Sequence, residues 1–212
     1  KIFEKKGDFN FSEGYGIQIS VNSVKLLNKI GFKNLPASDV YFPRKVNFFQ
    51  SNNFKKICDI DLNQFNDDIN RYTTTKRSTL LKFLLENIPN DKIKFNTTLN
   101  HLDYDDDIKA HFSDESQENF DFLVIADGVF SRSKLIISKE SLSPKYNNSI
   151  ALRGKINKYD DKNISIFLGS NFHYVIYPVN QHNEYNFVAI LKKKITQAKL
   201  DNKEILKSEH FL

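Results

Sequence analysis

Apolar and polar residues alternate along much of the second half of this chain, and the alternation predicts a β-sheet. Four stretches carry the two-residue period of a strand: 150–156, 164–168, 174–179 and 185–191. Residues 40–62 alternate as well. The polar Ser51-Asn52-Asn53 lies between their two apolar runs, and this arrangement predicts a β-hairpin.

Two other segments carry the period of a helix. Apolar residues recur at 24, 27 and 30, so we expect a helix that follows an N-cap at Asn22 or Ser23 and ends at Gly31. Residues 76–88 show the strongest helical pattern, and Pro89 ends it. The order along the chain is therefore α/β, hairpin, α/β and antiparallel strands. This order indicates a nucleotide-binding domain that a sheet domain interrupts twice.

A mostly apolar run, Phe122–Ala126, stops abruptly at Asp127-Gly128. We expect a buried strand here, after strands over 93–102 and 108–112, with a helix-like segment behind it. Such a strand would deliver a carboxylate and bare backbone to the carboxyl edge of a parallel sheet, where open α/β sheets bind their ligands. The alternative is an ordinary strand and turn, since Asp-Gly is a common turn dipeptide.

The first four residues resemble the end of a strand that closes on a carboxylate. In a dinucleotide-binding fold, the acidic residue after the second strand takes the ribose hydroxyls of adenosine, and this pattern assigns that role to Glu4. The glycine-rich turn of such a fold would lie some twenty residues earlier, before Lys1. We therefore expect the sequence to be part of a longer chain.

Composition excludes several classes of protein. Hydrophobic residues make up 40% and charged residues 27% of the chain, as in ordinary soluble domains, and no apolar run is long enough for a transmembrane helix. The formal charge of +5 comes from scattered lysines, so nucleic-acid binding is not predicted. The single cysteine, Cys58, fits a reducing compartment and a cytoplasmic protein, and we expect it to be a small core residue.

No metal site is predicted from the histidines. His101, His111, His182 and His210 have no Cys or His partners at the spacing of metal ligands. We expect these ionisable residues not to cluster.

The run from Asp121 to Lys134 resembles the second fingerprint of FAD-dependent aromatic-ring monooxygenases. The matching residues are Ala126, Asp127, Gly128 and Ser131. Ile125 stands where that family has Gly, and Lys134 stands where it has Arg. Lys134 keeps the positive charge but lacks the bidentate fork of a guanidinium.

Three further segments resemble the same family in the same order. Residues 14–20 are similar to a Gly-x-Gly-Ile-Gln segment of its salicylate hydroxylase-like branch. The helix that follows the hairpin matches an Arg-x-x-Leu-x-x-x-Leu pattern at Arg77, Leu80 and Leu84. The third segment matches a signature of salicylate and hydroxynicotinate hydroxylases at Gly169, His173, Tyr177, Pro178 and Asn186.

The resemblance implies a definite architecture. It predicts an α/β fold in which a Rossmann-like FAD-binding domain of the glutathione-reductase type is interrupted by a mainly antiparallel β-sheet substrate domain. The flavin domain would comprise residues 1–35 and 73–142, and the substrate domain residues 36–72 and 143–212. Both would be incomplete, so the sequence by itself is expected to bind FAD poorly and to be inactive.

The resemblance also implies a reaction and its residues. NADH or NADPH would reduce the FAD, O2 would form a flavin C4a-hydroperoxide, and a small aromatic substrate, phenolic or salicylate-like, would be hydroxylated. His173 would remove the phenolic proton with help from Tyr177. The substrate pocket would include Gln18, Val175 and Pro178. The flavin would contact the following residues: Glu4, Lys5, Arg77, Leu99, Asp127 and Gly128.

Other interpretations of the sequence remain open. The chain is also compatible with a ubiquinone-pathway type of flavin ring hydroxylase, although the His-x-x-x-Tyr-Pro segment argues against it. It is further compatible with a remnant flavoprotein that has no catalytic activity. No membrane insertion is expected, and a homodimer is left open.

Overall fold

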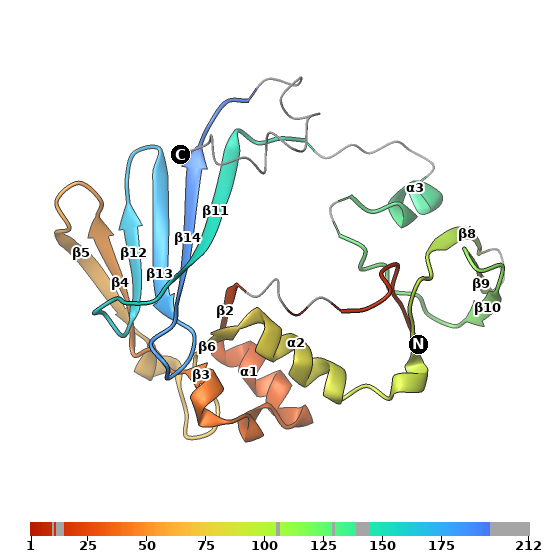
Figure 1. The fold of residues 1–212 in the computed structure, drawn as a ribbon, viewed down its shortest axis with the longest axis horizontal. Helices are drawn as coiled ribbons and strands as arrows, with labels where there is room; N and C mark the ends of the chain where they lie inside the picture. The colour runs from red at the N-terminus through yellow and green to blue at the C-terminus, as the bar shows by residue number, and fades with distance from the viewer. Residues whose placement is uncertain (10, 12–14, 105–106, 129, 139–144, 196–212) are drawn as a thin grey trace. The chain divides into compact units, whose positions relative to one another are not determined.

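The computed structural model describes residues 1–9, 11, 15–104, 107–128, 130–138 and 145–195 (Figure 1). Contacts divide the chain into two compact units. One unit comprises residues 1–10 and 85–146, and the other comprises residues 11–84 and 147–212. These boundaries differ from those of the predicted flavin and substrate domains, and the assignment of domains by ligand stays a prediction.

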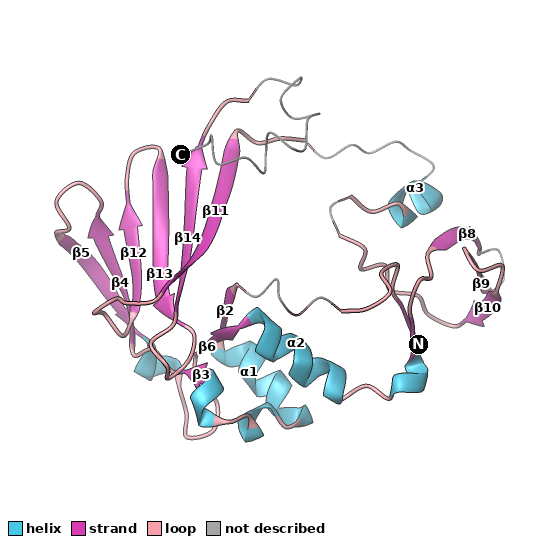
Figure 2. Cartoon of the chain, in the orientation of Figure 1, coloured by secondary structure: helices cyan, strands magenta, loops and turns pink. Residues whose placement is uncertain are grey.

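A six-stranded sheet dominates the second unit (Figure 2). Its order is β11-β14-β13-β12-β4-β5, and every neighbouring pair is antiparallel except β12 and β4. The predicted hairpin is confirmed as β4 and β5, and all four predicted strands of the second half are present. The bounds are β4 Lys45–Gln50, β5 Lys56–Asp61, β11 Ser149–Ile156, β12 Ile164–Leu168, β13 Phe172–Pro178 and β14 Tyr185–Lys192.

The two faces of this sheet differ in chemistry because successive side chains point to opposite sides. One face carries an aromatic row that crosses the strands. The ring centroids of Phe49 and Phe167 are 5.1 Å apart, and those of Phe167 and Tyr174 are 4.5 Å apart. The opposite face packs Ile164 and Tyr177 with their neighbours into a second apolar cluster.

A smaller layer completes the second unit. Strand β6 pairs with β2 and with β3, and helices α1 and α2 lie beside this sheet (Figure 2). Ile19, Val24, Phe32 and Phe83 form the core between them. The bounds are β2 Gly16–Ile19, α1 Val21–Leu27, β3 Val40–Tyr41, β6 Thr73–Lys76 and α2 Arg77–Glu86, with 3-10 turns over Asn28–Ile30, Phe32–Asn34, Ala37–Asp39 and Leu62–Phe65.

The first unit contains two small sheets and one short helix. Strands β1 and β7 are parallel, and β10, β9 and β8 form an antiparallel sheet whose core includes Leu102, Ala110 and Phe112. The bounds are β1 Ile2–Phe3, β7 Ile93–Lys94, β8 Leu99–Asp103, β9 Ile108–Phe112, β10 Gln117–Phe120 and α3 Ser133–Ser138, with a 3-10 turn over Asn90–Lys92. No helix in the described part of the chain has the length and apolar character needed to cross a bilayer.

The predicted buried strand over 122–126 is wrong. The segment forms no ladder with any described strand, and the side chains of Phe122 and Val124 are 79% and 71% exposed. Leu123, in contrast, packs on the core of the first unit. Exposed and packed side chains therefore alternate along this segment, as they would in a strand with one buried face, but the segment pairs with no described strand. An apolar segment becomes a strand only when a partner pairs with its backbone, and the described residues supply none.

Three smaller expectations also fail. Helix α1 begins two or three residues earlier than predicted, with Ser20 at its N-cap, although Gly31 ends the helical segment at φ 95° as predicted. Cys58 is exposed because β5 is the outer strand of the sheet. Two histidines do cluster: Nε2 of His101 and Nε2 of His111 lie 2.9 and 2.8 Å from the two oxygens of Asp103.

Asp161 ties the start of β12 to β4. Its carboxylate accepts hydrogen bonds from Asn47 Nδ2 at 2.9 Å, Ser165 Oγ at 2.7 Å and the Asn163 amide at 2.9 Å. Partial burial alone would raise the pKa of this carboxyl, but these hydrogen bonds outweigh burial and lower the pKa. The network therefore stabilises the ionised form.

We predict that Asp161→Asn lowers the free energy of unfolding by about 1–3 kcal/mol at neutral pH, because an amide NH2 would face donors. Since the folded pKa is depressed, the contribution of Asp161 is present above the unfolded pKa and is lost as the pH falls through the folded pKa. Urea unfolding at several pH values measures both effects. The exposed neighbour Asp160→Asn is the control, and equal stability of both variants would contradict the prediction.

Candidate functional site

The sheet face opposite the aromatic row carries the predicted catalytic pair. His173, Val175 and Tyr177 alternate along β13 and therefore point to the same side. Four residues of strand separate His173 from Tyr177 by about 13 Å along the backbone, so the two side chains do not bond directly. A ring that lies over Val175 could contact both.

The two members of this pair have different environments. His173 is exposed, whereas Tyr177 is 4% exposed and belongs to the apolar cluster with Ile164. Burial raises the pKa of the Tyr177 hydroxyl well above its usual value, and the positive charge of Arg153 offsets only part of this shift. Tyr177 is therefore protonated at neutral pH, and its hydroxyl keeps a proton that it can donate in a hydrogen bond.

Gln18, predicted to line the substrate pocket, lies on β2 in the same unit. Its Oε1 accepts a hydrogen bond of 2.8 Å from the hydroxyl of Tyr72, and Tyr72 packs on the cluster that contains Tyr177. Pro178 is buried, and its carbonyl accepts a hydrogen bond from the hydroxyl of Thr74. The predicted pocket residues of this unit thus lie on connected elements.

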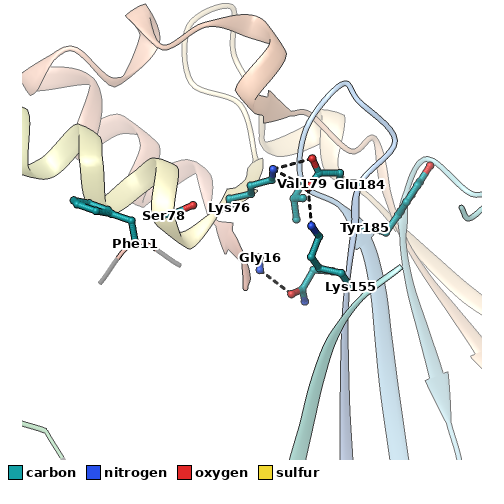
Figure 3. A pocket seen from close by; sticks show the side chains of 9 residues that line it. Phe11, Gly16, Lys76, Ser78, Lys155, Val179, Glu184 and Tyr185 are labelled. Atoms are coloured by element: carbon teal, nitrogen blue, oxygen red, sulfur yellow. Dashed lines mark hydrogen bonds and ion pairs between the residues drawn. The ribbon is translucent and has the colours of Figure 1, made fainter. Parts of the chain in front are cut away.

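A polar pocket of about 200 Å³ lies between β2, β14 and the beginning of α2 (Figure 3). Lys76 and Lys155 both face Glu184 there, with Nζ to carboxylate distances of 2.7 and 3.6 Å. Ser78, Phe11 and Asn186 also line it. The Lys76 hydrogen bond is the main cause that lowers the pKa of Glu184, so this carboxylate is ionised at neutral pH.

Gly16 is the point at which β2 meets the large sheet. Its amide donates a 2.7 Å hydrogen bond to Asn186 Oδ1. A Cβ at Gly16 would lie 2.5 Å from Cβ of Asn186 and 2.6 Å from Cγ1 of Val179. Only glycine allows this close approach of the strand backbone to the sheet.

In the first unit, Asp127 and Gly128 form the turn before α3. Gly128 has φ 84°, which favours glycine. One oxygen of Asp127 accepts a hydrogen bond from the Ser133 amide at 3.1 Å. Burial alone would raise the pKa of Asp127, but hydrogen bonds from Ser131 and Ser133 outweigh it and lower the pKa. The carboxylate thus caps α3, and these residues line a shallow pocket with Lys134.

The other predicted flavin contacts lie in both units. Glu4 follows β1, and its Oε1 accepts a hydrogen bond from the Lys6 amide at 2.9 Å, while Lys5 is exposed. The side chain of Leu99 packs against the apolar core of the first unit, so the part of Leu99 that could contact a flavin is mainly its backbone. Arg77, in the second unit, is exposed on the first residue of α2.

Sequence reasoning missed several polar groups of the second unit. Arg153 lies on the same sheet face as Tyr177, because it pairs in register with Val188 and Val188 pairs with Val175. Lys155, Asn186 and Tyr177 form the next row across β11, β14 and β13. The alternating pattern of β11 placed Arg153 and Lys155 on one face, but only the register shows which strands they adjoin.

The fold is that of solved FAD-dependent monooxygenases. HpxO of Klebsiella pneumoniae, crystallised with FAD and uric acid, matches with TM-score 0.77 and 16% identity over 92% of this chain and 51% of that chain. The 2,6-dihydroxypyridine-3-hydroxylase of Arthrobacter nicotinovorans matches with TM-score 0.73 and 16% identity over 92% and 50%. A salicylate hydroxylase substrate complex matches with TM-score 0.69 and 14% identity over 86% and 49%.

The chain thus spans about half the length of the solved structures it matches. No family model and no curated protein matches the sequence. The resemblance that the motifs predicted is confirmed at the level of the fold: a mixed α/β chain with a largely antiparallel sheet. The Rossmann-like arrangement of the flavin domain stays a prediction.

We predict that Gly16→Ala lowers the free energy of unfolding by about 1–3 kcal/mol, because the added methyl overpacks the contact between β2 and β14. Gly154→Ala on β11 is a matched control, since a Cβ there would meet no atom within 4 Å. Urea unfolding of the two variants measures the difference. Equal loss of stability in both variants would contradict the prediction, because it would show that Asn186 and Val179 can move to make room for the added methyl.

Proposed function

We propose that this chain is part of an FAD-dependent monooxygenase that uses NADH or NADPH and O2 to hydroxylate a small aromatic substrate. One observation supports the proposal above the others. An exposed imidazole, a buried neutral phenol and an exposed guanidinium share one face of the sheet. The fold around this face is that of proteins crystallised with FAD and uric acid or named as salicylate hydroxylase.

The described residues fit a flavin dinucleotide. Arg77 presents a guanidinium at the first turn of a ten-residue helix, where backbone amides favour an anion such as a pyrophosphate. Gly128 leaves the backbone of its turn open to a ligand, since no heavy atom lies within 4 Å of where its Cβ would be. When bound, the flavin supplies the redox chemistry and the activation of oxygen.

The chain itself supplies positioning and proton transfer. A phenolic ring over Val175 would place its hydroxyl within reach of the imidazole of His173, and an imidazole is a side chain suited to act as a general base. Tyr177 remains protonated and can hold a polar group at the other end of the ring. The half-buried side chains of Val175, Val188 and Ile166 provide the apolar floor on which such a ring would lie.

We predict that Arg77→Ala in the complete protein weakens FAD retention about ten- to a hundred-fold, because a charge-assisted contact to an anion is lost. Flavin content after dialysis, measured from visible absorbance, checks this. The exposed Arg71→Ala is the control. Equal flavin content in Arg77→Ala and wild type would place the pyrophosphate elsewhere, whereas a wild-type protein without any flavin would exclude the enzyme and favour a remnant without catalytic activity.

We predict that His173→Ala in the complete protein slows hydroxylation about 10²–10⁴-fold while flavin reduction continues, because the base that removes the phenolic proton is lost. NAD(P)H consumption should then yield H2O2 in place of product. Product and H2O2 per NAD(P)H consumed, followed across pH, measure the coupling.

Tyr177→Phe tests the second member of the pair. It should reduce coupling more mildly and leave the pH profile unchanged, since the raised pKa keeps this hydroxyl from titrating near neutral pH. If His173→Ala keeps the coupling and pH dependence of the wild type, His173 is only a structural residue of the strand.

A further inference from the structure

The amide of Asn186 has a fixed orientation. Its Oδ1 accepts the hydrogen bond from the Gly16 amide, so Nδ2 points the other way. The side chain is 2% exposed, and Nδ2 has no hydrogen-bond partner among the described residues. An unpaired buried donor is costly unless a ligand or water accepts from it. Asn186 lines the polar pocket, so a ligand bound in this pocket can supply the acceptor that Nδ2 lacks.

The surroundings of Nδ2 favour an acceptor with negative charge. Lys76 and Lys155 line the same pocket and share a single carboxylate, Glu184, which leaves one positive charge in excess. Ser78, in the first turn of α2, adds a hydroxyl at the end of a helix where anions are stabilised. The pocket thus combines a buried amide donor, a hydroxyl and two ammonium groups.

The pocket also adjoins the candidate substrate face. Lys155 on β11 pairs directly with Asn186 on β14, and Asn186 pairs directly with Tyr177 on β13. The side chains of these three residues therefore begin next to one another on one face of the sheet. A group bound at Nδ2 therefore lies next to the strand position of Tyr177, which the proposed function assigns to the substrate site.

We propose that this pocket is an anion subsite that binds a carboxylate or phosphate group, with Asn186 Nδ2 as its buried donor and Lys76 and Lys155 as its charges. The carboxylate could belong to the aromatic substrate and the phosphate to a nucleotide. The subsite does not require the proposed hydroxylation: a protein without flavin could still bind an anion here.

Asn186→Asp tests the subsite without removing the contact to β2. The carboxylate keeps the shape of the side chain and still accepts from the Gly16 amide, but it replaces the donor with a negative charge. We expect binding of benzoate or of inorganic phosphate to the complete protein, measured by calorimetry, to weaken about ten- to a hundred-fold. Flavin content and the KM for NADH and NADPH are measured on the same protein.

Lys155→Gln should weaken binding of the same probe. Lys45→Gln is its matched control, since the Lys45 ammonium also lies 3.6 Å from a carboxylate, that of Asp59, but on β4 outside the pocket. Thermal unfolding shows that each variant is folded.

The arms of the experiment identify the source of the anion. Loss of benzoate binding alone assigns the subsite to a substrate carboxylate. Loss of phosphate binding, of flavin or of affinity for the nicotinamide nucleotides assigns it to a nucleotide phosphate. If folded Asn186→Asp and Lys155→Gln bind both probes, FAD and the nucleotides as the wild type does, the subsite is refuted. Absence of flavin from the wild type would refute the proposed function only.

Discussion

The register between β13 and β14 is the constraint on which the candidate site depends. It sets Tyr177 opposite Asn186 and Val175 opposite Val188, and the register of β14 with β11 then adds Lys155 and Arg153 to the same face. A slip of one residue would send all of these side chains to the aromatic face. The contact on the aromatic face between Tyr174 of β13 and Phe187 of β14, whose ring centroids are 5.9 Å apart, works against such a slip.

Strand β2 depends on the same register. Gly16 fits against Asn186 and Val179 because no Cβ stands between them, and the hydrogen bond from its amide orients the Asn186 side chain. The position of β2 in turn brings Gln18 to Tyr72 and the cluster around Tyr177. The apolar floor, the polar pocket and the catalytic pair of the proposal therefore belong to one packed unit of the chain.

Local patterns in the sequence predicted the local elements well. The strands from 149 to 192 and helix α2 begin and end within a few residues of the prediction. The reason is that apolar residues recur along the sequence with the period of the element whose one face they bury. The ends of elements at Gly31 and at the Asp127-Gly128 turn could be predicted because glycine readily adopts the positive φ that both positions have. The motifs around His173 and Asp127 predicted the fold.

Features that need a partner could not be predicted in this way. Residues 122–126 have the apolar pattern of a strand but no strand to pair with, and Cys58 is exposed because β5 is the edge of its sheet. The contact of His101 and His111 with Asp103 depends on a β8–β9 pairing that includes an irregularity. The free Nδ2 of Asn186 follows from a hydrogen bond to a residue 170 positions away.

The proposed function requires that an oxygen atom from O2 enters an aromatic ring bound on this sheet face. The most direct measurement supplies the complete protein with NAD(P)H, salicylate and isotopically labelled O2 in unlabelled water, and then analyses the product by mass spectrometry. The account predicts one labelled oxygen atom in each hydroxylated product molecule. Product that carries oxygen from water, or NAD(P)H oxidation without any hydroxylated ring from a panel of phenols, would contradict it.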